Sequence, residues 1–169
     1  MKKSVLFTVL FTTLYLPLVS PLARANDIVN VKNIGMELAR DIATDAVKAC
    51  REMGYQVSAV VVDRNGLTRV VLRDDLASRF TIQLAEEKAN TVILGGVASS
   101  EMRKNRGDIR PELNHVKGIL VLEGGLPINT GGYRIGALGV SGAPGGDIDE
   151  KCAQQALKNY EERLEFAAE

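Results

Sequence analysis

His115 is the first residue to weigh for chemistry, because it is the only histidine in this chain of 169 residues. A single imidazole cannot supply the two or three histidines that a zinc site usually takes from one subunit. The two cysteines, Cys50 and Cys152, stand far apart and form no C-x-x-C pair for zinc or for thiol redox chemistry. These spacings argue against a zinc enzyme.

Other catalytic templates also fail on spacing. The run Gly139-Val140-Ser141-Gly142-Ala143 departs from the nucleophile elbow G-x-S-x-G at its last residue. No G-x-G-x-x-G follows an expected strand and no G-x-x-x-x-G-K-S/T is present, so neither of these phosphate-binding loops is predicted. A conventional hydrolase or dehydrogenase is disfavoured, and no catalytic residue is assigned.

Ligand binding is the chemistry that remains. Neutral imidazole is a good iron donor, although a lone histidine is more often a surface residue or one satisfied by hydrogen bonds. Arg103, Lys104 and Arg106 form a basic cluster that could receive anionic groups. The ordinary polarity of a loop explains these three residues equally well, so both interpretations stay open.

A glycine-rich stretch, Gly118–Asp147, organises the second half of the chain. It contains three short β-type runs, joined at Gly124-Gly125 and at residues 129–132, where glycine and asparagine favour hairpin turns. The third run, Tyr133–Ser141, is rich in small residues, which allow another backbone, a helix or a flat ligand to approach closely. A glycine-punctuated meander inside a core is the plainer interpretation.

The same stretch carries the motifs GGLPI and G-x-x-I-G-A-x-G-V-S-G, followed by Asp147 at an expected helix start. In these motifs the chain resembles the GlcG/HbpS family of haem-binding-type proteins, and the resemblance extends from about Val31 to the C-terminus. It implies a profilin-like fold with a five-stranded sheet covered by helices, an assembly of several subunits, and haem or a related tetrapyrrole as ligand.

A haem site needs apolar walls and an axial iron donor. Such walls could come from the small-residue strand Tyr133–Ser141, which includes Gly136 and Gly139, and from the helix that carries Ile82 and Ala89. The candidate axial donors are His115, Tyr133, Met36, Met53 and Met102. Lys88-Ala89 matches a pair typical of the family, so Lys88 could hold a propionate or a small organic acid, as could Arg103. A solvated lysine on a helix face is the alternative for Lys88.

The N-terminus predicts export. Lys2 and Lys3 precede an apolar run, and Ala23-Arg24-Ala25 follows it, which is typical of a signal peptide cleaved between Ala25 and Asn26. We expect a single domain at residues 26–169, located in the periplasm or secreted, with no membrane contact after cleavage. Without the signal the chain has 18 basic and 21 acidic residues, so nucleic acid is not an expected partner.

The periodicity of apolar residues predicts an α+β fold with a largely antiparallel sheet. Helices are expected at residues 33–53, 81–94 and 99–105, and from Asp147 onward with Asp147 as N-cap and Glu150 completing a capping box. Strands are expected at residues 55–63, 67–73, 119–123, 126–129 and 133–141. The strand at residues 55–63 is nearly continuous in apolar residues, so it should be central and covered on both faces.

Cys50 and Cys152 fall in the last turn of the first expected helix and the first turn of the last one. If these helices pack antiparallel on one face of the sheet, the two ends meet and a disulfide forms in an oxidising compartment. Two buried free thiols are an equally good interpretation.

The leading hypothesis is an exported, homo-oligomeric protein that binds haem or a related tetrapyrrole in order to store, sense or sequester it. The main alternative is an enzyme or accessory protein that acts on a small organic acid such as a 2-hydroxy acid. An oligomeric module without a ligand is the third interpretation.

Overall fold

The computed structural model describes residues 29–167, so the expected signal peptide and its cleavage site lie outside the described residues. Contacts divide the chain into Met1–Asn30 and Val31–Glu169, and the described helices and strands belong to the second unit. They are α1 (Met36–Glu52), β1 (Ser58–Asp63), β2 (Thr68–Arg73), α2 (Phe80–Gly95), α3 (Ser99–Asn105), α4 (Arg110–Leu113), β3 (Gly125–Thr130), β4 (Tyr133–Ser141), α5 (Gly146–Lys158) and α6 (Glu161–Phe166). None of these helices is long and apolar enough to cross a membrane.

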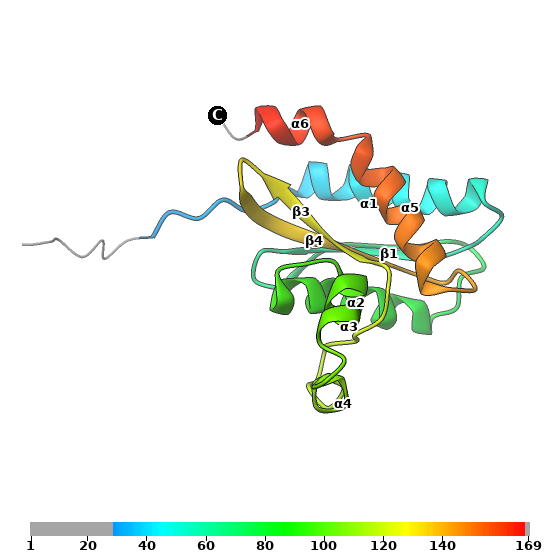
Figure 1. Cartoon of the computed structure of the whole chain (residues 1–169). Helices are drawn as coiled ribbons and strands as arrows, with labels where there is room; N and C mark the ends of the chain where they lie inside the picture. Colours follow the sequence, from blue (N-terminus) through cyan, green and yellow to red (C-terminus); the bar gives the residue numbers. More distant parts are fainter. Residues whose placement is uncertain (1–28, 168–169) are drawn as a thin grey trace, which may run out of the picture. The chain divides into compact units, whose positions relative to one another are not determined.

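The strands of the described segment form one antiparallel sheet in the order β2-β1-β4-β3 (Figure 1). The β1–β2 turn contains Gly66 with a φ of +83°, as the Asn-Gly signal predicts. β1 is central and buried along its whole length. The predicted α+β class and the antiparallel sheet are therefore confirmed.

The prediction of a fifth strand at residues 119–123 is wrong for the chain as described. The Leu120 N–H donates to the Glu87 carbonyl oxygen at 3.3 Å and to the Thr91 hydroxyl at 3.2 Å. Both partners belong to α2, so this segment runs along a helix instead of pairing with a strand. A short apolar run predicts that a segment is covered, but not whether a strand or a helix covers it.

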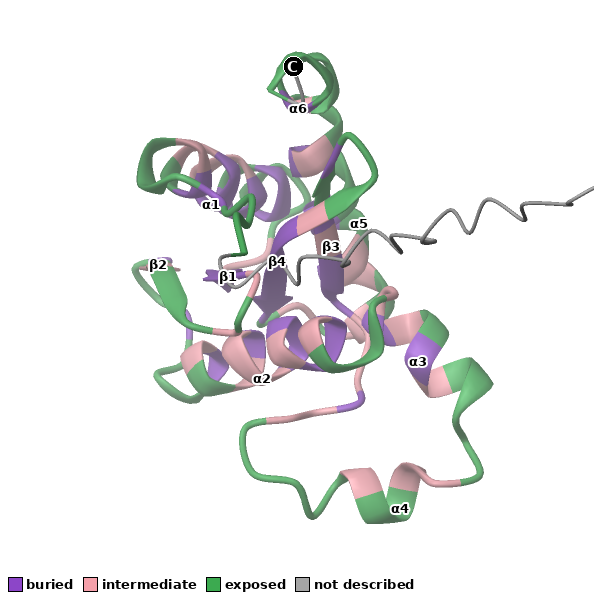
Figure 2. Ribbon diagram, turned by 90° about the vertical axis from the view of Figure 1, so that its left-hand side faces the viewer, coloured by how far each residue is buried: buried purple, intermediate pink, exposed green. Residues whose placement is uncertain are grey.

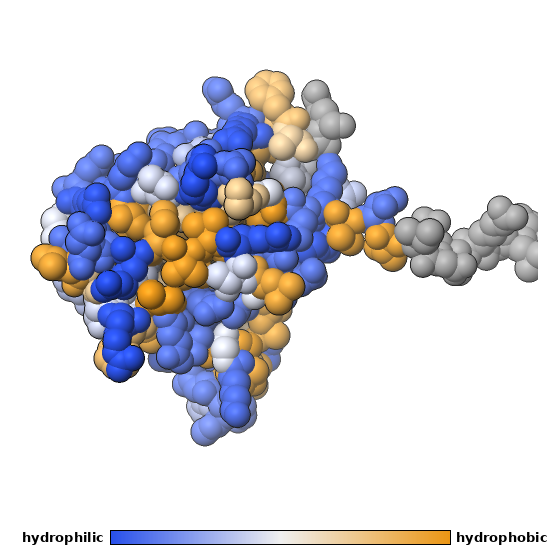
Figure 3. All heavy atoms as spheres, turned by 180° about the vertical axis from the view of Figure 1, so that it is seen from behind, coloured by the Kyte–Doolittle hydropathy of each residue, from blue (hydrophilic) through white to orange (hydrophobic). Residues whose placement is uncertain are grey.

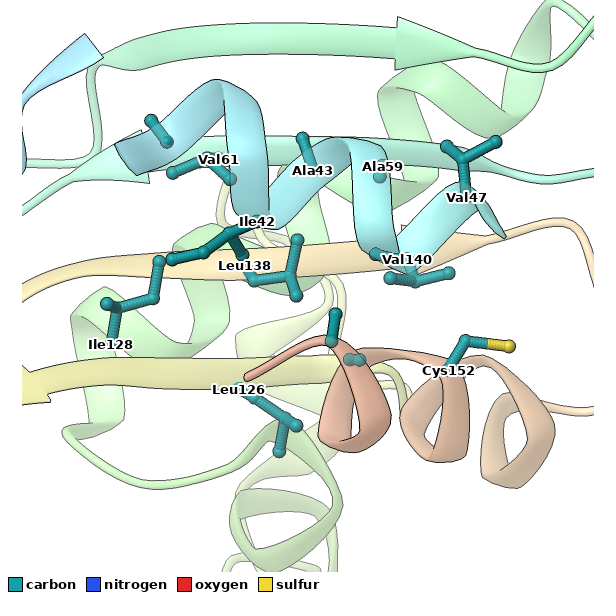
Figure 4. Packing of buried hydrophobic residues seen from close by; sticks show 14 of the residues in the cluster. Ile42, Ala43, Val47, Ala59, Val61, Leu126, Ile128, Leu138, Val140 and Cys152 are labelled. Atoms are coloured by element: carbon teal, nitrogen blue, oxygen red, sulfur yellow. The ribbon is translucent and has the colours of Figure 1, made fainter. Parts of the chain in front are cut away.

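Helices cover both faces of the sheet, with α1 and α5 on one face and α2 on the other (Figures 1 and 2). The larger core cluster fills the space between the sheet, α1 and α5, and Figure 4 shows Ile42 of α1 over Leu138 of β4 within it. A smaller cluster on the other face joins the sheet to α2 through Val60, Val62, Ala85, Ala89, Val92 and Ala137.

The small residues of β4 make room for neighbouring backbone. A Cβ added to Gly139 would clash with the backbone carbonyl of Ala85 in α2. One added to Gly136 would lie 2.5 Å from the Val62 carbonyl oxygen of β1. The space in front of Gly139 is thus occupied by α2. Of the neighbours that small residues in a strand allow, a helix is the one that approaches here.

Two connections fix the C-terminal end of α1. Cys50 forms a disulfide with Cys152 of α5, across 102 positions of sequence. Next to it, the Arg51 guanidinium donates to both oxygens of Asp74, with 2.7 Å between Nε and Oδ2. This hydrogen bond lowers the pKa of the Asp74 carboxyl below its ordinary value. The end of α1 is therefore held both by α5 and by the segment that follows β2.

Protein purified without reductant should contain no titratable thiol after unfolding. In the chain-entropy estimate, a bridge that closes a loop of about 100 residues stabilises the fold by up to ~4.7 kcal/mol. Cys50→Ala/Cys152→Ala should therefore lower the free energy of urea unfolding by about 2–4 kcal/mol. Two free thiols in the parent protein, or a double variant as stable as the parent, would contradict the bridge.

Candidate functional site

The connection between α3 and β3, residues 106–124, contributes residues to several hollows of the described surface, and we call it the arm. It extends away from α2, makes the single turn of α4 and returns along α2 (Figure 2). Pro111 lies in the first turn of α4, where a missing N–H leaves no hydrogen bond unmade. Loops held by a rigid scaffold are common places for binding residues.

One hollow of about 330 Å³, the His115 hollow, lies on the returning half of the arm. His115 is exposed, and the basic residues Arg110 and Lys117 line the same hollow. Its remaining lining is Glu87, Asn114, Val116, Gly118, Ile119, Leu120, Val121 and Leu122. One imidazole, two cations and an apolar wall are thus gathered in one place.

A second and more open hollow of about 800 Å³, the cationic hollow, is lined by Ser100, Glu101, Arg103, Lys104, Arg110 and Glu123. Arg103 Nη1 lies 3.3 Å from Glu123 Oε1, and both side chains are about one-third exposed. Arg110 lines this hollow as well as the His115 hollow, so the two are neighbours. The structure therefore places Arg103 and His115 around one shared arginine.

Lys88 is not a solvated lysine, because only 1% of it is exposed. Its Nζ donates to Asp149 Oδ2 of α5 at 2.7 Å and to the Val140 carbonyl of β4 at 3.0 Å. Burial raises the pKa of the Asp149 carboxyl, although the Lys88 charge acts in the opposite direction. Lys88 lines neither hollow and instead joins α2, β4 and α5.

This buried pair belongs to a larger set of contacts that holds both ends of the arm. Glu150, next to Asp149, accepts from the Ser100 hydroxyl at 2.8 Å and from the Gly124 N–H at 3.3 Å. Ser100 precedes the arm and Gly124 closes it. Nearby, the Gly125 N–H donates to the Ser99 hydroxyl at 2.8 Å. The first turn of α5 therefore sets where the arm leaves and where it returns.

The predicted capping box at the start of α5 is wrong. The helix begins at Gly146 with Gly145 as N-cap, and no side chain caps it. Asp147 is exposed and lies 3.4 Å from Lys151, while Glu150 is used by the arm. Asp147 and Glu150 have the D-x-x-E spacing of a capping box, but Glu150 instead accepts hydrogen bonds from Ser100 and Gly124.

The other candidate residues lie elsewhere. Tyr133 is exposed at the start of β4, with its ring 5.3 Å from Lys32 Nζ. Ser141 is buried at the other end of β4, where it pairs with Ser58 of β1. Of the methionines, Met36 and Met53 are exposed on and after α1, and Met102 is buried in α3. None of these five side chains lines the His115 hollow or the cationic hollow.

Sequence reasoning missed Arg110, Lys117 and Asp149, and it assigned Glu150 to a capping box instead of to its contacts with the arm. For Asp149 a signal existed: it lies on the buried stripe of α5, three and seven residues before Cys152 and Ala156. Lys88 interrupts the buried stripe of α2 in the same way, between Ala85 and Val92. Opposite charges on two apolar stripes indicate a buried ion pair. Arg110 and Lys117 offered no such signal, because a loop sequence does not fix which side chains converge.

Lys88→Met should lower the free energy of unfolding by about 3–5 kcal/mol at pH 7, because the buried Asp149 loses its cation. The loss should shrink on acidification. A carboxyl whose folded pKa is raised stabilises the fold below its unfolded pKa, and that contribution is lost as the pH rises through the folded pKa. Urea unfolding of parent and variant between neutral and acidic pH measures the difference.

The double variant Lys88→Met/Asp149→Leu should recover most of that loss, since apolar residues of similar size often replace a buried pair without net cost. Lys151→Met is the matched control, because Lys151 pairs with Asp147 on the exposed side of α5, the helix that carries Asp149. It should change stability by less than about 0.5 kcal/mol. Equal stabilities of Lys88→Met and Lys151→Met would rule out the buried pair.

The chain is similar to several proteins of known structure. HbpS is 36% identical with a TM-score of 0.75, over 81% of this chain and 96% of that one. The Klebsiella pneumoniae protein ORFY is 28% identical with a TM-score of 0.72, over 79% and 94%. A haem complex of PduOC is 23% identical with a TM-score of 0.65, over 75% and 94%, and supports the fold alone. No curated protein matches the chain significantly.

A family profile described as "Haem degrading protein HbpS-like" matches residues 34–158, which contain the whole sheet, the arm and all of α5. The predicted relationship is confirmed by this match and by the similarity to HbpS. The chain belongs to the HbpS-like family.

Proposed function

We propose that this protein binds haem or a related tetrapyrrole through the His115 hollow. The observation that carries the proposal is the gathering of His115, Arg110 and Lys117 beside an apolar wall, in a chain of the HbpS-like family. An imidazole is an iron donor, and the two cations suit the propionate groups of haem. PduOC, which shares the fold, has been solved as a haem complex.

The chemical character of the residues that line the His115 hollow suits haem. Ile119, Leu120 and Leu122 provide partly buried apolar surface, and Val116 is about half exposed at the rim. A volume of about 330 Å³ lies at the lower end for ligand sites, so a macrocycle would extend past the hollow. The cationic hollow adjoins it at Arg110 and offers room and positive charge for that extension.

His115 would supply the axial ligand when haem is bound, and the iron would supply the absorbance that reports binding. Arg110 and Lys117 would hold the carboxylates at the wet edge. Storage, sensing and sequestration all require this binding step, and we propose one of these as the biological role.

We also propose that the protein acts outside the cytoplasm, in the periplasm or secreted, after cleavage between Ala25 and Asn26. The n-region, apolar run and A-x-A motif of residues 1–25 support this. The Cys50–Cys152 disulfide also suits an oxidising compartment.

A small organic acid as substrate or ligand is the second candidate function, and the cationic hollow favours it. Arg103, Lys104 and Arg110 converge there, and a guanidinium binds a carboxylate through two parallel hydrogen bonds. Turnover of a 2-hydroxy acid without any haem spectrum would favour this function over the first.

Haemin added to the parent protein at micromolar concentration should shift the Soret band with saturable binding. His115→Ala should weaken binding and move the band, because it removes the proposed axial donor. Tyr133→Phe is the control, since Tyr133 lies on the hairpin away from the hollow, and its spectrum should match that of the parent. Absence of any spectral shift in the parent would reject the proposed function. A spectral change in Tyr133→Phe but not in His115→Ala would show that haem binds at Tyr133 instead of in the His115 hollow.

Self-association is a further part of the proposal. Apolar side chains gather on one face of the molecule (Figure 3), and β2, at the sheet edge, lies on that side. Leu67, Val71, Leu76 and Phe80, in β2 or beside it, are all exposed. An edge strand with exposed apolar residues is a common contact between subunits. We expect a closed symmetric assembly, and light scattering that gives the mass of a single chain would count against it.

A further inference from the structure

A third hollow lies against the arm, and it takes no part in either proposed function. We call it the apolar hollow. It measures about 450 Å³ and is lined by Leu94, Gly95, Val97, Met102, Asn105, Arg106, Ile109 and Leu113. The end of α2, the length of α3 and the α4 turn form its walls. Apolar side chains dominate this lining, whereas charged side chains dominate the cationic hollow.

The α4 turn separates the apolar hollow from the His115 hollow. Ile109 and Leu113 stand four residues apart, on one side of the turn, and line the apolar hollow. Arg110 and Asn114, also four apart, line the His115 hollow. The turn is therefore a wall with an apolar side and a polar side, and the two hollows are distinct sites.

The floor of the apolar hollow is made by a close contact between α2 and α3. Met102 is buried, and a Cβ added to Gly95 would lie 2.9 Å from the Met102 sulfur. Glycine at position 95 thus lets the methionine lie against the end of α2. Leu94, at the mouth, is 53% exposed, so apolar surface faces water there. A ligand that covered this surface would gain free energy by burying it.

The polar groups of the lining indicate what the ligand carries. Arg106 and Asn105 are exposed and contribute hydrogen-bond donors to an otherwise apolar wall. Arg106 Nε lies 3.4 Å from Asp108 Oδ1, and with both side chains about half exposed or more this pair is weak. The guanidinium can therefore turn to a carboxylate on a ligand at little cost.

We propose that the apolar hollow binds a small amphipathic monocarboxylate, with its hydrocarbon body on Leu94, Val97, Met102, Ile109 and Leu113 and its carboxylate on Arg106. The volume lies in the range of sites for drug-sized ligands, which suits a medium-chain fatty acid. This site needs no iron and no tetrapyrrole, so it stands independently of the proposed haem site.

Equilibrium dialysis of the full chain against radiolabelled decanoate, with labelled decanol as the uncharged comparison, tests the site. The parent should bind one decanoate per chain. Arg106→Ala should weaken decanoate binding by about ten- to a hundredfold, because it removes a hydrogen bond to a charged group, and should leave decanol binding unchanged. Leu94→Glu should abolish binding of both, because it places a carboxylate in the apolar mouth.

Phe166→Glu is the matched control: Phe166 is 72% exposed at the end of α6, outside the hollow and outside the proposed subunit contact, and this variant should bind as the parent does. No saturable binding of decanoate by the parent overturns the proposal. Equal loss in Leu94→Glu and Phe166→Glu overturns it too, since binding would then depend on surface charge. Displacement of decanoate by one equivalent of haemin would show that the hollows are one site, and would overturn the claim of a separate one.

Discussion

The ion pair between Lys88 and Asp149 is the contact on which the rest of the structure depends. It lies between the two faces of the sheet, because Lys88 comes from α2 on one side and Asp149 from α5 on the other. Lys88 also donates to the Val140 carbonyl at the end of β4, and Asp149 accepts from the Ala143 N–H just after that strand. Two charges removed from water are tolerated only with such additional hydrogen bonds. The pair therefore fixes how three layers meet.

The position of the candidate site depends on this ion pair, because the residue next to Asp149 holds both ends of the arm. Glu150 follows Asp149 and holds both Ser100 before the arm and Gly124 at its end. One turn further along α5, Cys152 is bonded to α1, so α5 cannot move without disturbing the larger core. Gly124 has a φ of +116°, and an added Cβ would lie 2.7 Å from the Val140 carbonyl oxygen, so the chain needs glycine where the arm returns. The arm is irregular in conformation but anchored at both ends, as a binding loop must be to present side chains reproducibly.

Sequence patterns predicted the elements that depend on local periodicity. The stripe in α1, the continuous apolar run of β1 and the Asn-Gly turn all gave the observed structure. Prediction failed where tertiary partners decided the outcome. Residues 119–123 hydrogen-bond to α2 instead of to a strand. Glu150 accepts a hydrogen bond from Gly124 of the arm instead of capping α5. For Lys88 the sequence left a ligand-binding role and a solvated helix face open, and neither anticipated a buried ion pair, because the partner Asp149 lies 61 positions away.

For the site, sequence reasoning selected His115 and Arg103 but could not place them. Their proximity arises from the α4 turn, which brings Arg110 between them, and a single turn of helix leaves little periodicity to detect. Tyr133 and the glycines of β4 were selected from the same glycine-rich stretch, yet they lie against other parts of the fold. A shared stretch of sequence is therefore a poor guide to a shared site when strands and loops alternate.

Hydrogen–deuterium exchange with and without haemin tests the central claim, that the ligand binds on an arm anchored by α5, most directly. Exchange should slow at residues 114–122, which line the His115 hollow. It should stay unchanged at residues 129–134, the β3–β4 hairpin that carries Tyr133. Protection of the hairpin with no change in the arm would contradict the account.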